Sequence, residues 1–295
     1  MKLKMNRDAW VKGGQTTLLG GESIWFRIDG AGPTIFFAHG FPTSSQDFAP
    51  IIAQLKAKYR CVSFDFLGFG ASSKPRCEYS YPLQHQVLAR VAEDADIQRA
   101  FLVVHDYAVT LGQDFLAGTP QAPFALDGVI FMNGAIDPAQ HRARLVQRFL
   151  ASRAGALLGP RLLTRGNVLR ALRAVLIRNE HLSDDDVWES ITNNDGLAIQ
   201  PRLLHYIAER RARREELLAA LGKVTAPKAF VWGADDPVSG RHVLAAVRHL
   251  IGDAPLVELR GIGHYPHLEA SGEVATFIDQ TCEMWRGATT ASSER

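Results

Sequence analysis

The sequence predicts an α/β fold in which a parallel sheet is covered by helices. Short apolar runs recur along the 295 residues, and longer segments between them carry Leu, Ile, Val and Ala at helical spacing. Polar or glycine-rich motifs follow several of the runs, where a strand would end. Strands of a parallel sheet are buried on both faces, so continuous apolar runs are their signature. Their alternation with helical segments favours repeated strand-helix-strand units.

Six apolar runs are predicted strands, and four of the segments between them are predicted helices. Right-handed crossovers place the loops after the strands at one edge of the sheet, where functional residues gather in such folds. The strands are expected at 35–39, 61–66, 101–105, 128–133, 229–233 and 255–260, and the helices at 46–58, 83–99, 107–117 and 241–250.

The alternation breaks between residues 138 and 222, where Arg, Leu and Ala dominate and no β-branched run reaches strand length. We expect a helical cap at 138–222, inserted into a core domain formed by 1–137 and 223–295. The cap holds 14 Arg, no Lys and nine Asp or Glu. A solvated helix face, or arginine stems buried against the sheet domain, explains these residues better than a lid that attracts anions.

Composition excludes several classes of protein. The balance of 33 basic and 31 acidic residues, with no long basic block, argues against nucleic-acid binding. No apolar run is long enough for a signal peptide or a membrane span, and GATTASSER at 287–295 looks like a frayed tail. Three widely spaced cysteines fit neither a disulfide framework nor a zinc site. We therefore expect a cytoplasmic monomer or homodimer without metal or cofactor, which binds neither nucleic acid nor membrane.

Asp106 stands where the apolar run FLVVH at 101–105 passes directly into a helical pattern. A carboxylate at a sharp strand-to-helix turn lies beside free N–H groups and the positive end of a helix dipole, so it stays ionised and open to a ligand. Such a turn presents a nucleophile. Taken alone, Asp106 is better explained as an N-cap residue.

Three other motifs favour a nucleophile over an N-cap role for Asp106. HGFP at 39–42 follows a strand, so the backbone N–H of Phe41 could stand beside that of Tyr107 as a pair of oxyanion donors. GADDP and GIGHYPHLE follow two later strands and contribute an acid and His264. The chain order nucleophile, acid, base is the order found on α/β-hydrolase sheets.

Taken together, these motifs resemble the α/β-hydrolases with an aspartate nucleophile, which include epoxide hydrolases and haloalkane dehalogenases. The resemblance spans nearly the whole chain and implies Asp236 as the acid, with Asp137 as second choice. The cap, through NNDG at 193–196 and LLHYIAERR at 203–211, is similar to the mesoderm-specific transcript proteins. The motifs that carry the resemblance are HGFPTSS at 39–45, DFLGFGASSKP at 65–75, HDYAVTLGQD at 105–114, WGADDP at 232–237 and GHYPHLE at 263–269.

The chain departs from these families at informative positions. Haloalkane dehalogenases usually hold the halide with a Trp after the nucleophile and an Asn after the His-Gly pair, where this chain has Tyr107 and Phe41. Epoxide hydrolases usually aim two cap tyrosines at the epoxide oxygen, whereas 138–222 contains only Tyr206. His181 and His205 could replace the missing donor. The usual glycines around the nucleophile are also absent.

An aspartate nucleophile points to an electrophilic saturated carbon, because attack on an ester would give an anhydride. The resemblance therefore implies a cofactor-independent epoxide hydrolase in which Tyr206 protonates a hydrophobic epoxide. A core tyrosine is an equally good interpretation of Tyr206. Trp188 and Phe41 are candidates to line an apolar pocket. The alternatives are a haloalkane dehalogenase and a catalytically silent binding protein; a serine esterase is disfavoured because no Ser stands at the turn.

Overall fold

The sheet has eight strands in the order β1-β2-β4-β3-β5-β6-β7-β8. The computed structural model describes residues 6–142, 144–150, 152, 155, 163–178, 183–222 and 226–293. β2 runs antiparallel to β1 and β4, and the other pairs are parallel. The strands are β1 (Gln15–Leu19), β2 (Glu22–Asp29), β3 (Thr34–Ala38), β4 (Arg60–Phe64), β5 (Arg99–His105), β6 (Ala125–Met132), β7 (Lys228–Gly233) and β8 (Leu256–Leu259).

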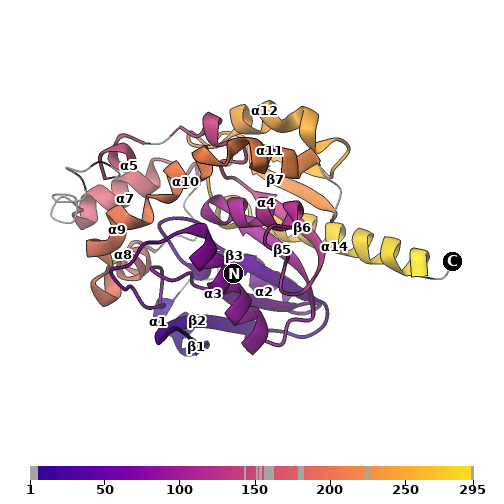
Figure 1. Cartoon of the computed structure of the whole chain (residues 1–295), viewed down its shortest axis with the longest axis horizontal. Helices are drawn as coiled ribbons and strands as arrows, with labels where there is room; N and C mark the ends of the chain where they lie inside the picture. The colour runs from indigo at the N-terminus through magenta and orange to yellow at the C-terminus, as the bar shows by residue number, and fades with distance from the viewer. Residues whose placement is uncertain are drawn as a thin grey trace.

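Helices cover both faces of the sheet and enclose two hydrophobic cores (Figure 1). One core is formed against α3, α4 and α12, and the other against α2 and α14. Continuous burial of β3 and β5 on both faces follows from this sandwich. The core helices are α1 (Arg7–Lys12), α2 (Ala49–Leu55), α3 (Tyr81–Asp94), α4 (Val109–Ala117), α12 (Arg241–Ile251), α13 (Pro266–Glu269) and α14 (Ser271–Ser293), with short 3-10 turns η1 (Ser45–Phe48) and η2 (Asp106–Ala108).

The six predicted strands are confirmed with small shifts of their ends, and the four predicted helices are found as α2, α3, α4 and α12. β1 and β2 were not predicted from the sequence, because both strands are partly exposed and lack a continuous apolar run. The expected frayed tail is wrong, since α14 continues to Ser293. Ala, Thr and Ser do not stop a helix that is already nucleated.

The segment between β6 and β7 is helical, and in its described residues it contains no strand. Figure 1 shows α5, α7, α8 and α9 grouped at one side of the molecule, while α10 and α11 lead back toward β7. The helices are α5 (Leu145–Leu150), α7 (Arg165–Arg173), α8 (Asp184–Thr192), α9 (Gly196–Leu203), α10 (Tyr206–Ala212) and α11 (Arg214–Gly222), with 3-10 turns η3 (Pro138–Gln140) and η4 (Asn193–Asp195).

A buried carboxylate fastens the cap to the loop that carries His264. Glu269 accepts hydrogen bonds from the backbone N–H groups of Ile177 and Arg178, at 2.8 and 2.9 Å. It also accepts bonds from the N–H groups of Gly263 and Tyr265, at 3.0 and 3.1 Å. One side chain therefore holds a cap segment and the histidine loop together.

None of the described helices is both long enough and apolar enough to cross a membrane.

Candidate active site

Asp106 lies at a tight turn between β5 and η2, with a backbone φ of +44° that non-glycine residues rarely adopt. Its backbone N–H bonds to Asn133 O at 2.9 Å. The room for this turn comes from glycines on two neighbouring loops. A Cβ added to Gly40 would lie 2.8 Å from Asp106 Cβ, and one added to Gly134 would lie 2.9 Å from Asp106 O. Val104 and Ala108 therefore suffice where related turns use glycine.

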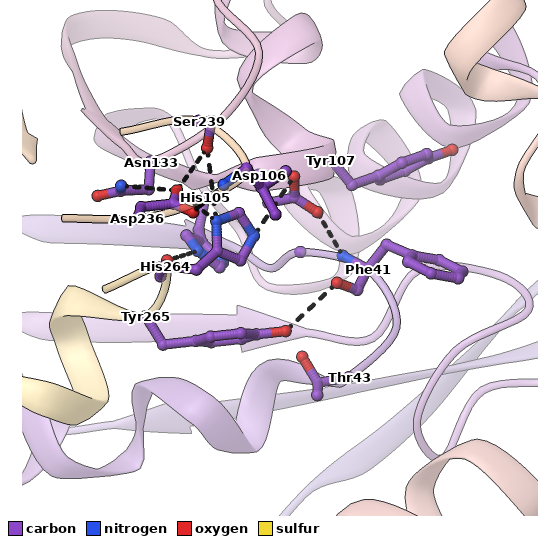
Figure 2. Close-up of polar contacts among 12 residues, drawn as sticks. Phe41, Thr43, His105, Asp106, Tyr107, Asn133, Asp236, Ser239, His264 and Tyr265 are labelled. Carbon is purple, nitrogen blue, oxygen red and sulfur yellow. Dashed lines mark hydrogen bonds and ion pairs between the residues drawn. The ribbon is translucent and has the colours of Figure 1, made fainter. Parts of the chain in front are cut away.

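The Asp106 carboxylate is buried and faces two partners from other strands (Figure 2). Oδ2 accepts a hydrogen bond from the backbone N–H of Phe41 at 3.1 Å. Oδ1 lies 3.7 Å from Nε2 of His264. Tyr265 donates its hydroxyl to Phe41 O at 3.3 Å, which steadies the loop after β3. The turn thus holds a carboxylate between an N–H donor and an imidazole.

His264 and Asp236 form a buried ion pair with 2.7 Å between His264 Nδ1 and Asp236 Oδ2. Burial alone lowers the pKa of His264, but the charge and hydrogen bond of Asp236, with the charge of Asp106, raise it to about 9. Burial alone raises the pKa of the Asp236 carboxyl, but His264 and three hydrogen bonds lower it to about 2. Contact with Asp236 leaves Nε2 of the imidazole facing Asp106.

The Asp236 carboxylate is also fixed by groups that the sequence analysis did not identify. Asn133 Nδ2 and Ser239 Oγ donate to Oδ2 at 3.0 and 2.7 Å, and Val238 N–H donates to Oδ1 at 2.7 Å. Asn133 Oδ1 accepts from Gly233 N–H at 2.6 Å, so Asn133 joins the ends of β6 and β7. Its position directly after an apolar run was the available signal.

The structure brings Asp236, and not Asp137, to the histidine. Asp137 is instead paired with Arg214, at 2.6 and 2.8 Å from Nε and Nη2. Asp235 accepts from Gly261 N–H at 2.7 Å and lies partly exposed. Each of the three acids at strand ends therefore has its own partners, and Asp236 is the one that contacts the imidazole.

A cavity of about 350 Å³ opens beside Asp106 and His264. Its polar walls include Gln200 from α9, while most of its surface is apolar. It is large enough for a small organic molecule and favours a hydrophobic one. The apolar lining comes from Phe41, Pro42, Phe149, Leu150, Leu163, Val168, Ala171, Leu172, Val175, Ile191, Val238 and Tyr265.

Of the residues predicted to bind substrate, only some lie at the cavity. Phe41 lines the cavity. Trp188 and His205 are not among its lining residues: Trp188 lies partly exposed on α8, and His205 is exposed at the start of α10. Helical spacing alone did not show which faces of α8 and α10 the cap packing would bury. His181 lies outside the described residues.

Tyr206 and Tyr107 are buried beside Asp106. Their rings meet edge to face with centroids 5.0 Å apart, and the Tyr206 ring lies 6.1 Å from that of Phe41. Within the described part of the chain, the Tyr206 hydroxyl has no hydrogen-bond partner. Burial, and after it the charge of Asp106, raises the pKa of Tyr206. Tyr206, the only tyrosine of the cap, therefore lies close to the carboxylate with its proton unused, although like Trp188 and His205 it is not among the residues that line the cavity.

Among the described residues, no group of three or more His, Cys, Asp or Glu side chains is placed to hold a metal ion.

The strand order, the turn after β5, and the acid and histidine after β7 and β8 define the class as a hydrolase with the α/β-hydrolase architecture. The sequence profile of the family described as alpha/beta hydrolase fold matches residues 33–271. The chain belongs to this family, and the resemblance seen in its motifs is confirmed at that level.

Two relatives extend over most of the chain. LipZ of Mycobacterium tuberculosis, named as a hydrolase, is 34% identical over 244 residues, which cover 81% of this chain and 84% of LipZ. The human mesoderm-specific transcript homolog protein is 31% identical over 280 residues, which cover 88% of this chain and 83% of the relative. The similarity of the cap to the mesoderm-specific transcript proteins therefore reflects a relationship of nearly the whole chain.

Solved structures agree on the fold. The haloalkane dehalogenase DbeA of Bradyrhizobium elkani superposes with a TM-score of 0.80 at 19% identity, covering 93% of this chain and 99% of DbeA. An α/β-hydrolase fold protein from Burkholderia ambifaria gives 0.74 at 22% identity, covering 90% of this chain and 96% of that one. At these identities the match shows the architecture of core and cap alone.

Proposed function

We propose that this hydrolase opens a hydrophobic epoxide to a vicinal diol through a covalent ester on Asp106. One observation carries the proposal: a carboxylate, and not a hydroxyl or thiol, stands at the positive-φ turn facing Phe41 N–H and His264. The largely apolar cavity beside it supports a small hydrophobic substrate.

The carboxylate restricts the electrophile. Attack on an ester carbonyl would give an anhydride, which is higher in energy than its reactants. Attack on a saturated carbon with a strained oxygen gives an ordinary ester. A carboxylate nucleophile needs no base for this step.

In the first step, an oxygen of Asp106 forms a bond to an epoxide carbon while the bond from that carbon to the ring oxygen breaks. The electron pair stays on the ring oxygen, which takes the proton of the Tyr206 hydroxyl. The products of this step are a hydroxyalkyl ester of Asp106 and a tyrosinate. The buried, unpartnered hydroxyl of Tyr206 supports this role.

In the second step, His264 takes a proton from water as the hydroxide adds to the carbonyl carbon of the ester. The charge of Asp106 is one cause of the raised pKa of His264. Esterification removes that charge, so the pKa of His264 falls and a larger fraction of the imidazole is neutral and able to accept a proton when a base is required. Phe41 N–H, with that of Tyr107, is suited to hold the developing oxyanion.

Collapse of the adduct releases the diol and restores the carboxylate. The two protons of the water end on the second hydroxyl of the diol, by way of His264, and on the tyrosinate. Epoxide and water are consumed and diol is formed, with every group of the protein returned to its starting state.

Haloalkane dehalogenation is the second candidate, because the same carboxylate can displace a halide. It is less well supported, since the positions expected to hold the halide are Phe41 and Tyr107, and neither side chain carries an N–H donor. An experiment that separates the two reactions therefore also tests the proposal.

The variant His264→Ala should form the ester but fail to hydrolyse it, so the intermediate accumulates. Intact-protein mass spectrometry after incubation with styrene oxide should show an added mass equal to the whole epoxide, and peptide mapping should place it on Asp106. The double variant with Asp106→Asn is the matched control and should stay unmodified.

A bromoalkane provides the opposing arm of this experiment. Modification by the bromoalkane alone, with an added mass lacking hydrogen bromide, would replace the proposal by dehalogenation. If wild-type protein turns over an epoxide while His264→Ala gives no adduct on Asp106, the covalent mechanism is wrong.

A further inference from the structure

Arg210 on α10 is an exception among the described arginines of the cap. Its side chain has 0% of its surface exposed, and within the described part of the chain Nε, Nη1 and Nη2 have no hydrogen-bond partner. Other cap arginines are half exposed and paired, such as Arg214 with Asp137 and Arg173 with Asp184. A buried charge without a partner costs several kcal/mol, so the expected solvated face does not explain this residue.

The contact that Arg210 does make is with the aromatic ring of Tyr206. The two residues are one helical turn apart on α10, and Arg210 Cζ lies 4.7 Å from the centroid of the Tyr206 ring. The other side of Tyr206 reaches the catalytic region, because its ring packs on Tyr107 and Phe41. Tyr206 therefore lies between a buried cation and the neighbours of Asp106.

Nothing described around Arg210 neutralises its charge. Glu209, the adjacent carboxylate, accepts hydrogen bonds from Tyr81 N–H at 3.1 Å. His141 is also buried, and burial, followed by the charge of Arg210, lowers its pKa to about 2, so its ring is neutral. Without a hydrogen-bond partner in the described residues, Arg210 directs its positive charge at its aromatic neighbours, and at Tyr206 the charge of Asp106 opposes it.

We propose that Arg210 is a positioning residue that acts through Tyr206: its buried charge stabilises the tyrosinate formed when Tyr206 protonates the epoxide oxygen. The inference rests on the proposed function. When the carbon–oxygen bond of the ring breaks and the proton leaves Tyr206, a negative charge appears beside a cation already in place. Preorganised charge of this kind lowers the barrier without reorganisation.

The charges around Tyr206 change during the reaction in a way that favours release of its proton. In the free protein, burial and the charge of Asp106 raise the pKa of Tyr206, while Arg210 lowers it. Formation of the ester removes the charge of Asp106 and leaves that of Arg210. Tyr206 therefore becomes a stronger acid as the ester forms, which is when its proton is needed.

The test is the variant Arg210→Met, with Arg211→Met, an exposed neighbour on the same helix, as the matched control. In single turnovers with styrene oxide, Arg210→Met should slow ester formation by about 10²-fold while leaving ester hydrolysis unchanged. Arg210→Lys, which keeps a positive charge, should recover part of the rate. Arg211→Met should behave as wild type.

Two further readouts do not depend on turnover. The melting temperature of Arg210→Met should rise by roughly 3–10 °C, because an apolar side chain replaces an unpaired buried charge. A ring-fluorinated tyrosine introduced at position 206 and titrated by fluorine NMR should show a higher pKa in Arg210→Met than in the parent protein.

These readouts separate the inference from the proposed function. If the wild-type protein fails to open any epoxide, the proposed function is wrong, and an unchanged pKa of the fluorinated tyrosine would then overturn the inference as well. Unchanged ester formation in Arg210→Met overturns the inference alone. A fall in melting temperature with equal losses in both steps would make Arg210 a purely structural residue.

Discussion

Removal of the Tyr206 hydroxyl distinguishes a core tyrosine from a proton donor. Tyr206→Phe removes a buried oxygen that has no hydrogen-bond partner in the described residues, so the fold should not lose stability. Ring opening should slow by about 10²- to 10⁴-fold, because the proton donor is lost. Epoxide turnover and thermal melting measured on the same samples check both statements. A Phe variant with wild-type turnover would show that Tyr206 is a core residue.

Asp236 contacts the histidine and not the substrate, so its substitution should slow the two steps of the reaction unequally. Asp236→Asn removes the charge that raises the pKa of His264. Ester hydrolysis should fall far more than ester formation, so the epoxide should be consumed in a burst as the ester accumulates, followed by a slow phase in which the diol is released. Rapid-quench measurement of both phases tests this. Equal losses in the two phases would give Asp236 a structural role only.

At the scale of elements, the turn after β5 depends on glycines that belong to other loops. Gly134→Ala would place a Cβ 2.5 Å from Val109 Cγ2 and 2.9 Å from Asp106 O. We expect a loss of about 1–3 kcal/mol in the free energy of unfolding, with lower activity, because the turn must shift. Urea unfolding measures the loss.

Gly166→Ala is the matched control for this variant. Gly166 lies in α7, and nothing would come within 4 Å of its added Cβ. Its stability should stay equal or rise slightly, since Ala is the better helix former. If Gly134→Ala were as stable and active as this control, the turn would have more room than the distances indicate.

The core elements could be predicted because the sheet imposes a simple pattern. Strands buried on both faces are continuously apolar, and parallel crossovers bring their carboxyl ends together. Asp106, Asp236 and His264 could therefore be placed on one edge from the sequence. Which strand-end acid meets the histidine could not be derived from spacing, since Asp137 and Asp236 both follow strands; the family resemblance decided it.

The cap was less predictable because its contacts depend on how short helices pack. Trp188 and Tyr206 have similar helical surroundings in the sequence, yet one lies partly exposed and the other is buried beside Asp106. Arg210 stood in a segment whose many arginines favoured a solvated face. Only the crossing of α10 over the core decides which of them is buried.

For the whole molecule, the raised pKa of His264 predicts how stability changes with pH. The pKa is about 9 in the folded protein and about 6.5 in an unfolded chain, so the ion pair contributes fully below about pH 6.5. The contribution, on the order of 3 kcal/mol, is lost as pH rises through about 9.

Urea unfolding at pH 6, 7.5 and 9.5 would reveal this dependence. His264→Gln is the control, because it has no group that titrates in this range at position 264 and should lack that part of the decline. A wild-type protein whose stability changes no more than that of the variant between pH 6 and 9.5 would contradict the assigned protonation of His264.

The link from Glu269 to both the cap and the histidine loop bears on how substrate enters. The backbone N–H of His264 donates to Val175 O at 2.9 Å, and Val175 also forms part of the cavity wall. A cap that swung away as a rigid body would break these bonds and displace the base. Molecules that enter or leave while this seam stays closed must pass between side chains, so the passage would select them by width.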